Sequence, residues 1–242
     1  MRKKGVLRCF FGEKVLKTSV FLVVALLCIS VYFLGQNIIS AQQNDVVYDY
    51  VIVIDAGHGG IDGGVVGKNT GVKESDINLE IAKLAKKVFV DSGFKVILTR
   101  ENEDGLYGSA TEGFKKRDMK KRQEIIQNAK ANLVLSVHCN KFASPLRSGP
   151  QVFFGKNTEG QKLALKLQKV LNDFTKNSHS PLEGDYFMLK CTTSPSVIVE
   201  CGFLSNPDDE AKLCDPNYRQ QLAETIFKGV MLYLSAGGMS EA

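Results

Sequence analysis

The sequence of 242 residues has no tryptophan, three histidines, six prolines and six cysteines. Two of the cysteines, Cys9 and Cys28, belong to the N-terminal leader, and the other four show no Cys-x-x-Cys spacing. This pattern argues against a disulfide-stapled fold and predicts buried free thiols instead. With few prolines and 22 glycines, the chain is neither collagen-like nor of low complexity. Its length predicts one sizeable globular domain behind the leader.

Outside the N-terminal leader, the chain has no excess of either basic or acidic residues. The whole sequence has 31 Lys and Arg against 26 Asp and Glu. Residues 1–44 contain six of the basic and one of the acidic residues, which leaves 25 of each sign for the remainder. A nucleic-acid-binding domain carries its basic excess on the folded part. The charge distribution therefore argues against nucleic acid as a partner.

The N-terminal leader has the features of an export signal. From Val20 to Leu34 all residues but two are apolar, and basic residues precede this run. The run is short for a membrane-spanning helix and long for a cleaved signal, and its basic flank predicts a cytoplasmic N-terminus. Cleavage after Ala41 would place a bulky isoleucine three residues before the cut. We therefore favour an uncleaved transmembrane signal-anchor at 18–35 over a secreted form.

The leader fixes the expected domain organisation. A basic cytoplasmic segment at 1–17 precedes the anchor, and the polar stretch 36–48 is expected to be a linker. One catalytic domain is predicted at 49–236, followed by a short tail at 237–242. The domain is expected to be extracytoplasmic.

Beyond the linker, strand-like runs alternate with helical patterns. Apolar, largely β-branched runs predict strands at 51–54, 95–99, 133–137, 152–154 and 197–199. Apolar residues at helical spacing predict helices at 77–89, 115–129, 163–174 and 222–233. This alternation predicts a three-layer α/β sandwich, with a mainly parallel, twisted sheet of five or six strands flanked by helices. The irregular stretch 101–113 is a candidate lid or substrate rim.

Three of the predicted strands end in residues that carry chemistry. His58 follows the first strand in a glycine-rich turn, His138 follows the third, and Glu200 follows the fifth. Ligands of parallel α/β sheets bind beyond the carboxyl ends of the strands, so we expect these side chains to meet. Considered alone, His58 could simply be part of a flexible turn, and His138 could be a buried histidine of the core. Glu74, just before a predicted helix, fits a charge that complements the helix dipole.

Together, these residues have the composition of a catalytic zinc site. Two imidazoles and one carboxylate leave one zinc position open for water. A second carboxylate is then free to act as general base, while the metal activates water and polarises a carbonyl. A Cys139–His138 nucleophile pair is disfavoured, because consecutive strand residues point to opposite faces. The third histidine, His179, lies in a polar stretch and is expected to be solvated.

The chain resembles the zinc-dependent N-acetylmuramoyl-L-alanine amidases of bacterial cell walls. The resemblance covers about Tyr50 to Leu234 and rests on five motifs in order. These are IDAGHGGIDGG (54–64), KESDINL (73–79), ILTR (97–100), LSVHCN (135–140) and VECGFLSN (199–206). The family's zinc ligands match His58, Glu74 and His138, and its catalytic glutamate matches Glu200. The resemblance thus implies one Zn²⁺ per chain, and we add Asn140 and Arg100 as weaker candidates for substrate contact.

The resemblance also implies a substrate and a setting. The substrate is peptidoglycan, cut at the amide between the lactyl group of N-acetylmuramic acid and L-alanine. The segment 99–126, the bare anchor and the lack of a wall-binding module are similar to the CwlD-type spore-cortex amidases, which remove stem peptides before a muramic deacetylase acts in δ-lactam formation. The expected location is then the forespore intermembrane space or the cell wall. Because the sequence shows no tryptophan and no dedicated sugar-binding module, we also expect that an accessory protein could supply affinity for the wall. A vegetative amidase, a zinc peptidase of the stem peptide and a non-catalytic peptidoglycan-binding protein remain alternatives.

Overall fold

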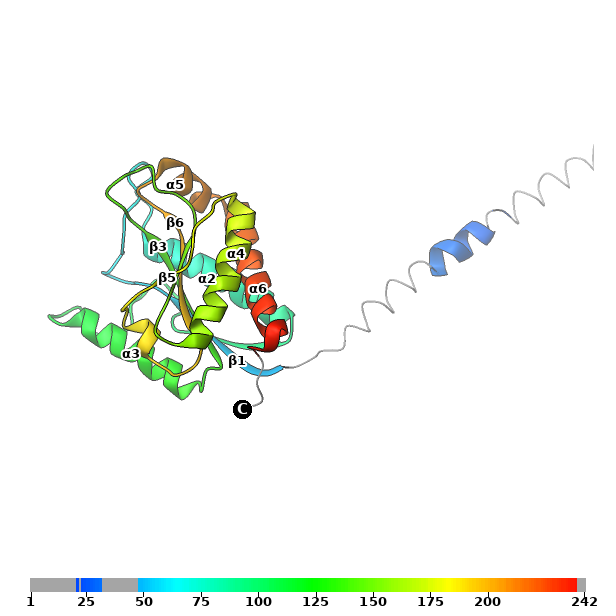
Figure 1. The fold of residues 1–242 in the computed structure, drawn as a ribbon. Helices are drawn as coiled ribbons and strands as arrows, with labels where there is room; N and C mark the ends of the chain where they lie inside the picture. The colour runs from blue at the N-terminus through cyan, green and yellow to red at the C-terminus, as the bar shows by residue number, and fades with distance from the viewer. Residues whose placement is uncertain (1–20, 22, 32–47, 239–242) are drawn as a thin grey trace, which may run out of the picture. The chain divides into compact units, whose positions relative to one another are not determined.

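The computed structural model describes residue 21, residues 23–31 and residues 48–238 (Figure 1). The chain divides into two compact units, Met1–Val46 and Val47–Ala242. In the first unit, the described residues are helical.

The predicted N-terminal segments fall largely outside the described residues. The segment 1–17 lies wholly outside them, as does most of the linker, and the anchor at 18–35 is described only in part. Among the residues that are described, no helix is both long enough and apolar enough to cross a membrane.

The second unit is built around one six-stranded sheet with the strand order β2-β1-β3-β6-β4-β5. Its strands are β1 (Tyr48–Ala56), β2 (Phe94–Leu98), β3 (Leu133–Asn140), β4 (Gln151–Phe154), β5 (Leu182–Glu183) and β6 (Ser196–Phe203). The pairs β2–β1, β1–β3 and β3–β6 are parallel, whereas β4 runs antiparallel to β6. The predicted α/β fold with a mainly parallel sheet is confirmed.

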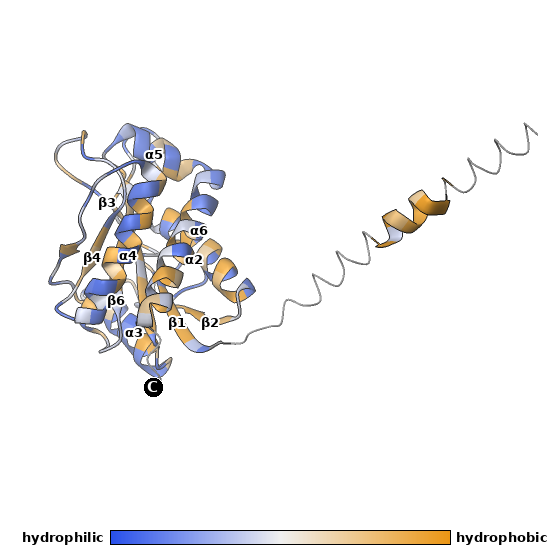
Figure 2. Cartoon of the chain, turned by 45° about the vertical axis from the view of Figure 1, so that its right-hand side comes forward, coloured by the Kyte–Doolittle hydropathy of each residue, from blue (hydrophilic) through white to orange (hydrophobic). Residues whose placement is uncertain are grey.

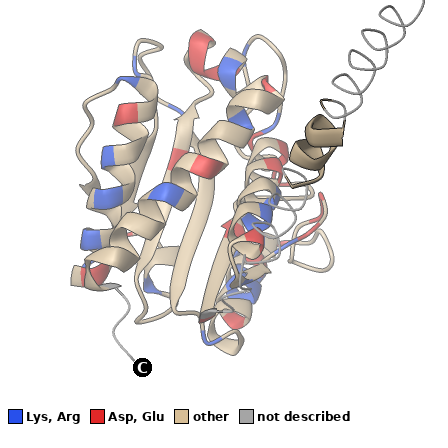
Figure 3. Ribbon diagram, turned by 90° about the vertical axis from the view of Figure 1, so that its right-hand side faces the viewer, with Lys and Arg blue, Asp and Glu red and all other residues tan. Residues whose placement is uncertain are grey.

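Helices cover the two faces of the sheet unequally. One face is covered by α2 (Glu74–Asp91), α4 (Thr158–Thr175) and α6 (Pro216–Tyr233). The other carries α3 (Phe114–Asn128) and the short 3-10 helix η1 (Met188–Lys190). Before α6 lies α5 (Pro207–Cys214), and the chain continues after α6 into η2 (Leu234–Gly238). Charged residues of both signs lie along the helices, while the strands are almost entirely uncharged (Figure 3).

The two faces have cores of very different size. Ile52, Ile54 and Leu135 are at most 1% exposed and belong to the large core under α2, α4 and α6. The intervening strand residues point the other way, and there Val53 and Val134 meet a small core with Ile126 of α3. The sheet is orange in the hydropathy view, as expected for strands buried on both faces (Figure 2).

The strands that carry the predicted site are longer than their apolar runs. His138 and Glu200 lie within β3 and β6 and are register partners, whereas the sequence places them just after the strands. The ladder continues past them to the pair Asn140 and Phe203, with an irregularity after His138. Backbone pairing between two parallel neighbours does not require apolar side chains, so polar residues extend these strands.

Candidate metal centre

The chain makes a tight turn directly after β1, and His58 lies within it. His58 has φ of +61°, in the left-handed region, and is followed by Gly59 and Gly60 with φ of +138° and +61°. The left-handed conformation costs a residue with a side chain about 1–2 kcal/mol. Gly57, just before His58, lies against His138: a Cβ atom there would be 2.2 Å from Cε1 of the imidazole. The turn thus brings the two histidines together, with ring centroids 5.1 Å apart.

Glu74 is the first residue of α2 and joins the two histidines. Its Oε1 lies 3.3 Å from Nε2 of His58 and 2.9 Å from Nδ1 of His138. Its Oε2 accepts a hydrogen bond from the Val65 backbone N–H at 2.9 Å. Burial by itself raises the pKa of this carboxyl, but hydrogen bonds from His138 and His58 outweigh it and hold the pKa well below its usual value. Glu74 is therefore an anion that faces both imidazoles, and not merely a complement to the helix dipole.

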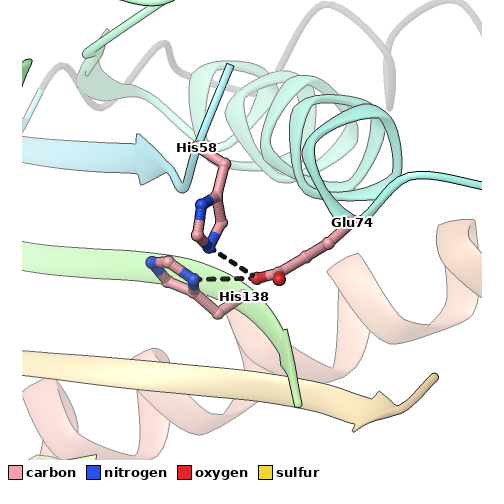
Figure 4. A group of neighbouring side chains, drawn as sticks. All are labelled: His58, Glu74 and His138. Carbon is pink, nitrogen blue, oxygen red and sulfur yellow. Dashed lines mark hydrogen bonds and ion pairs between the residues drawn. The ribbon is translucent and has the colours of Figure 1, made fainter. Parts of the chain in front are cut away.

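The three side chains converge in a geometry that suits a metal ion (Figure 4). The ligand atoms of His58, Glu74 and His138 all lie within 4.8 Å of one another. Ligand atoms of a tetrahedral zinc ion, at bond lengths of about 2.0–2.2 Å, are roughly 3.3 Å apart. The two distances to Glu74 are close to this value, and a set of two imidazoles and one carboxylate is a catalytic zinc set. The residues present therefore fit a zinc ion.

A further carboxylate supports His58 from outside this set. Oδ2 of Asp62 lies 3.1 Å from Nδ1 of His58, the ring nitrogen that faces away from Glu74. The contact has ion-pair distance without the alignment of a hydrogen bond. Carboxylates that accept a hydrogen bond from the outer ring nitrogen commonly orient metal-binding imidazoles, and Asp62 lies where such a carboxylate would be. Sequence reasoning missed Asp62, although its place four residues after His58 in the first motif was a usable signal.

Glu200 is the register partner of His138 in the parallel pair β3–β6, so their side chains lie on the same face of the sheet. Its Oε2 is buried and has no hydrogen-bond partner among the described residues. Burial raises the pKa of Glu200 to about 7, with His138 opposing the shift and Glu74 adding to it. A carboxyl that holds and releases a proton near neutral pH suits general acid–base work.

Glu200, His58 and His138 line one cavity of about 290 Å³. Its apolar lining includes Tyr107, before α3, with Phe114 and Met119 of α3, and also Tyr186, Phe187 and Met188 at η1. Most of the lining surface is apolar, which is typical of a small-molecule site. Charged side chains also line the cavity, namely Asp55, Asp62, Lys115, Asp118 and Arg122. The sequence gives no signal for this lining, because it comes from segments far apart in the chain. The loop 101–113, predicted to be a lid or substrate rim, contributes Tyr107 to the lining of this cavity.

Arg100 and Asn140 are not among the residues that line this cavity. Arg100 is 3% exposed, and its guanidinium donates hydrogen bonds to the backbone carbonyls of Ala56, Gly57, Ser75 and Asn102. Asn140 ends β3 and accepts a hydrogen bond from the Lys141 N–H through Oδ1. Both placements favour a structural role over substrate contact.

The remaining histidine and the buried thiols lie apart from these groups. His179 is half-buried, more than expected, with Nε2 2.8 Å from the carbonyl oxygen of Ser148. Cys139 is buried in the core on the opposite face from His138, as the strand alternation predicts.

Comparison with known protein families gives a match over residues 52–231 to the family described as N-acetylmuramoyl-L-alanine amidase. The chain belongs to this family. The amidase is 35% identical over 195 residues to the germination-specific N-acetylmuramoyl-L-alanine amidase of Bacillus subtilis, which covers 78% of this chain and 81% of the relative. It is 29% identical over 230 residues to the amidase AmiA of Escherichia coli, with 76% and 75% of the two chains covered.

A solved structure with the same fold is the CwlD amidase of Clostridioides difficile in complex with the GerS lipoprotein. It matches the amidase with a TM-score of 0.74 and 36% identity, over 78% of this chain and 100% of that one. The expected family, enzyme class and fold are thus confirmed.

Gly57→Ala is expected to disturb the site of the amidase by steric overlap alone. The added methyl would collide with the His138 ring, and overpacking of this kind costs about 1–3 kcal/mol. We expect a lower temperature of unfolding and weaker zinc binding, measured by calorimetry and by competition with a chromogenic chelator. Gly63→Ala is the matched control, since its Cβ would meet only the flexible Lys73 side chain, at 3.3 Å. Equal effects of both substitutions would contradict the prediction.

Proposed function

We propose that this amidase cleaves the bond between the lactyl carbonyl of N-acetylmuramic acid and L-alanine by zinc-dependent hydrolysis. His58, Glu74 and His138 hold the metal, and Glu200 is the catalytic acid–base. The observation that carries this assignment is the placement of Glu200, whose unpartnered carboxylate oxygen shares one cavity with two of the three ligands. When bound, zinc lowers the pKa of water to about 7 and polarises a carbonyl oxygen.

The residues of the chain then perform the proton transfers. Glu200 accepts a proton from the attacking water as the new carbon–oxygen bond forms. It returns that proton to the nitrogen of L-alanine as the carbon–nitrogen bond breaks. The apolar walls of the cavity limit access of water to this carboxyl. Arg100 and Asn140 act as supports of the surrounding loops.

Digestion of purified peptidoglycan by the full chain with added zinc tests this function. We expect free stem peptides that begin with L-alanine and muramic residues without peptide, both identified by mass spectrometry. A zinc peptidase would leave L-alanine on the sugar instead. Binding to peptidoglycan without any release would favour a non-catalytic protein on the same fold.

For the biological setting, we infer a role in the spore cortex. The support is the similarity to a germination-specific amidase and to the CwlD amidase, at 35% and 36% identity. Removal of stem peptides would supply the substrate of a muramic deacetylase in δ-lactam formation. Spores of a deletion strain should then lack muramic-δ-lactam in their cortex. A normal lactam content would instead support a vegetative amidase.

We further propose a membrane anchor at 18–35, ahead of an extracytoplasmic catalytic domain at 49–236. The basic flank and the apolar run support it. We expect the full chain to stay in washed membranes and its catalytic domain to be digested by protease added from the outer side. Release of the chain into the medium would contradict the anchor.

A lipoprotein is the proposed kind of accessory partner, because the CwlD amidase was solved with one. Co-purification from sporulating cells tests this, and recovery of the chain alone would count against it.

A further inference from the structure

The backbone of His58 is held in a conformation that its own residue type disfavours. Its φ of +61° belongs to the left-handed region. Such a residue keeps this conformation where the surrounding structure fixes it. Gly59 and Gly60 permit many conformations and cannot select one. The groups that bind the backbone of the turn therefore help to determine where the His58 imidazole points, beside the side-chain contacts of its ring.

Two buried arginines bind the carbonyl groups around His58. Arg122, on α3, donates from one terminal nitrogen to the Ala56 oxygen at 2.7 Å and from the other to the His58 oxygen at 2.6 Å. Arg100, after β2, donates to the oxygens of Ala56 and Gly57 at 2.9 and 3.0 Å. Three successive carbonyls thus point at guanidinium groups, and that of His58 itself is bound by Arg122.

The side chain of Arg122 is itself held in place by buried hydrogen bonds. It is 1% exposed, and its Nε donates to Oδ2 of Asp118 at 2.6 Å. Its Nη1 also donates to Oδ1 of Asp55 at 2.6 Å, and the other oxygen of Asp55 accepts from the Ser136 hydroxyl. The planar guanidinium matches all these acceptors at once, which the single ammonium group of lysine cannot do. A shift of the His58 carbonyl would break this arrangement.

We propose that Arg122 is a positioning residue of the metal centre, because its guanidinium holds the His58 turn in the left-handed form that directs the imidazole toward Glu74 and His138. Arg122 touches none of the three candidate ligand atoms and acts through the backbone. Asp118 extends the connection, since its Oδ1 accepts a hydrogen bond from the Leu106 N–H of the 101–113 loop. The position of His58 is therefore tied to the rim of the cavity. This inference rests on the proposed metal site and not on the amidase reaction.

Zinc affinity of the full chain with Arg122→Lys tests the proposal. Loss of groups that orient metal ligands typically weakens metal binding by about 10- to 100-fold, and we expect a loss in this range. The readouts are zinc competition with a chromogenic chelator and the absorption spectrum of the cobalt-loaded protein, which reports ligand geometry. A merely structural role would lower the unfolding temperature and leave both unchanged in the folded protein.

Arg219→Lys is the matched control. Arg219 is a largely buried arginine on α6, where its guanidinium binds the Leu213 carbonyl and Glu80 on the other side of the sheet. We expect wild-type zinc affinity for this variant. A folded Arg122→Lys chain with unchanged affinity and cobalt spectrum would overturn the proposal.

A second variant covers the case in which Arg122→Lys does not fold. Asp118→Asn keeps the size of the side chain and leaves Arg122 in place, but removes the charge that anchors its Nε. We expect a smaller loss of zinc affinity, in the same direction, and unchanged affinity would overturn the proposal. Failure of the wild-type chain to bind zinc would instead refute the metal site of the proposed function.

Discussion

Replacement of Glu200 by glutamine is expected to lower kcat by about 10²- to 10⁴-fold, the usual contribution of a general acid–base, while one zinc per chain is retained. Glutamine has the size of glutamate but cannot accept the proton of water at neutral pH. Its introduction breaks no hydrogen bond of Oε2 to a described residue, since that oxygen has none. The measurement combines kcat and KM on peptidoglycan fragments with the zinc content of the purified chain.

The control for this variant is Glu224→Gln, an exposed position on α6, which covers the other face of the sheet. We expect wild-type kcat and zinc content there. If Glu200→Gln kept most of its activity at full zinc content, Glu200 would not be the catalytic acid–base. If it lost zinc as well as activity, the carboxyl would act as a ligand.

The part of the site that follows from chain direction could be predicted from the sequence. Parallel strands end at the same edge of a sheet, so His58, His138 and Glu200 had to come close together. Their apolar runs located β1, β3 and β6 without any knowledge of pairing. The role of Glu74 could not be predicted from strand direction, because its local sequence fits a helix N-terminus equally well. Its orientation toward both imidazoles depends on how α2 packs on the sheet.

The supports of the site could not be predicted in this way. Arg122 lies in the charged stretch KKRDMKKRQE, where nothing local distinguishes it from the exposed Arg117 or Lys121. Its burial depends on the juxtaposition of α3 with Asp55 at the end of β1. The aromatic lining of the cavity could not be predicted either, since Tyr107 and Tyr186 line it from distant parts of the chain. The two-residue strand β5 is too short to show any periodicity.

His58→Ala is expected to abolish both zinc binding and turnover, in contrast to Glu200→Gln. Loss of one of the three proposed ligands should weaken zinc binding by more than the roughly 10- to 100-fold typical of an orienting group, so the variant should lose zinc at ordinary zinc concentrations. Alanine removes the imidazole and leaves the carbonyl that Arg122 binds, so the fold should persist. His179→Ala is the matched control, because that histidine contacts the Ser148 carbonyl and is not part of the candidate ligand cluster. Zinc affinity and peptide release, measured side by side on the two variants, distinguish the outcomes. A His58→Ala chain that bound zinc as tightly as the His179→Ala chain would remove His58 from the ligand set.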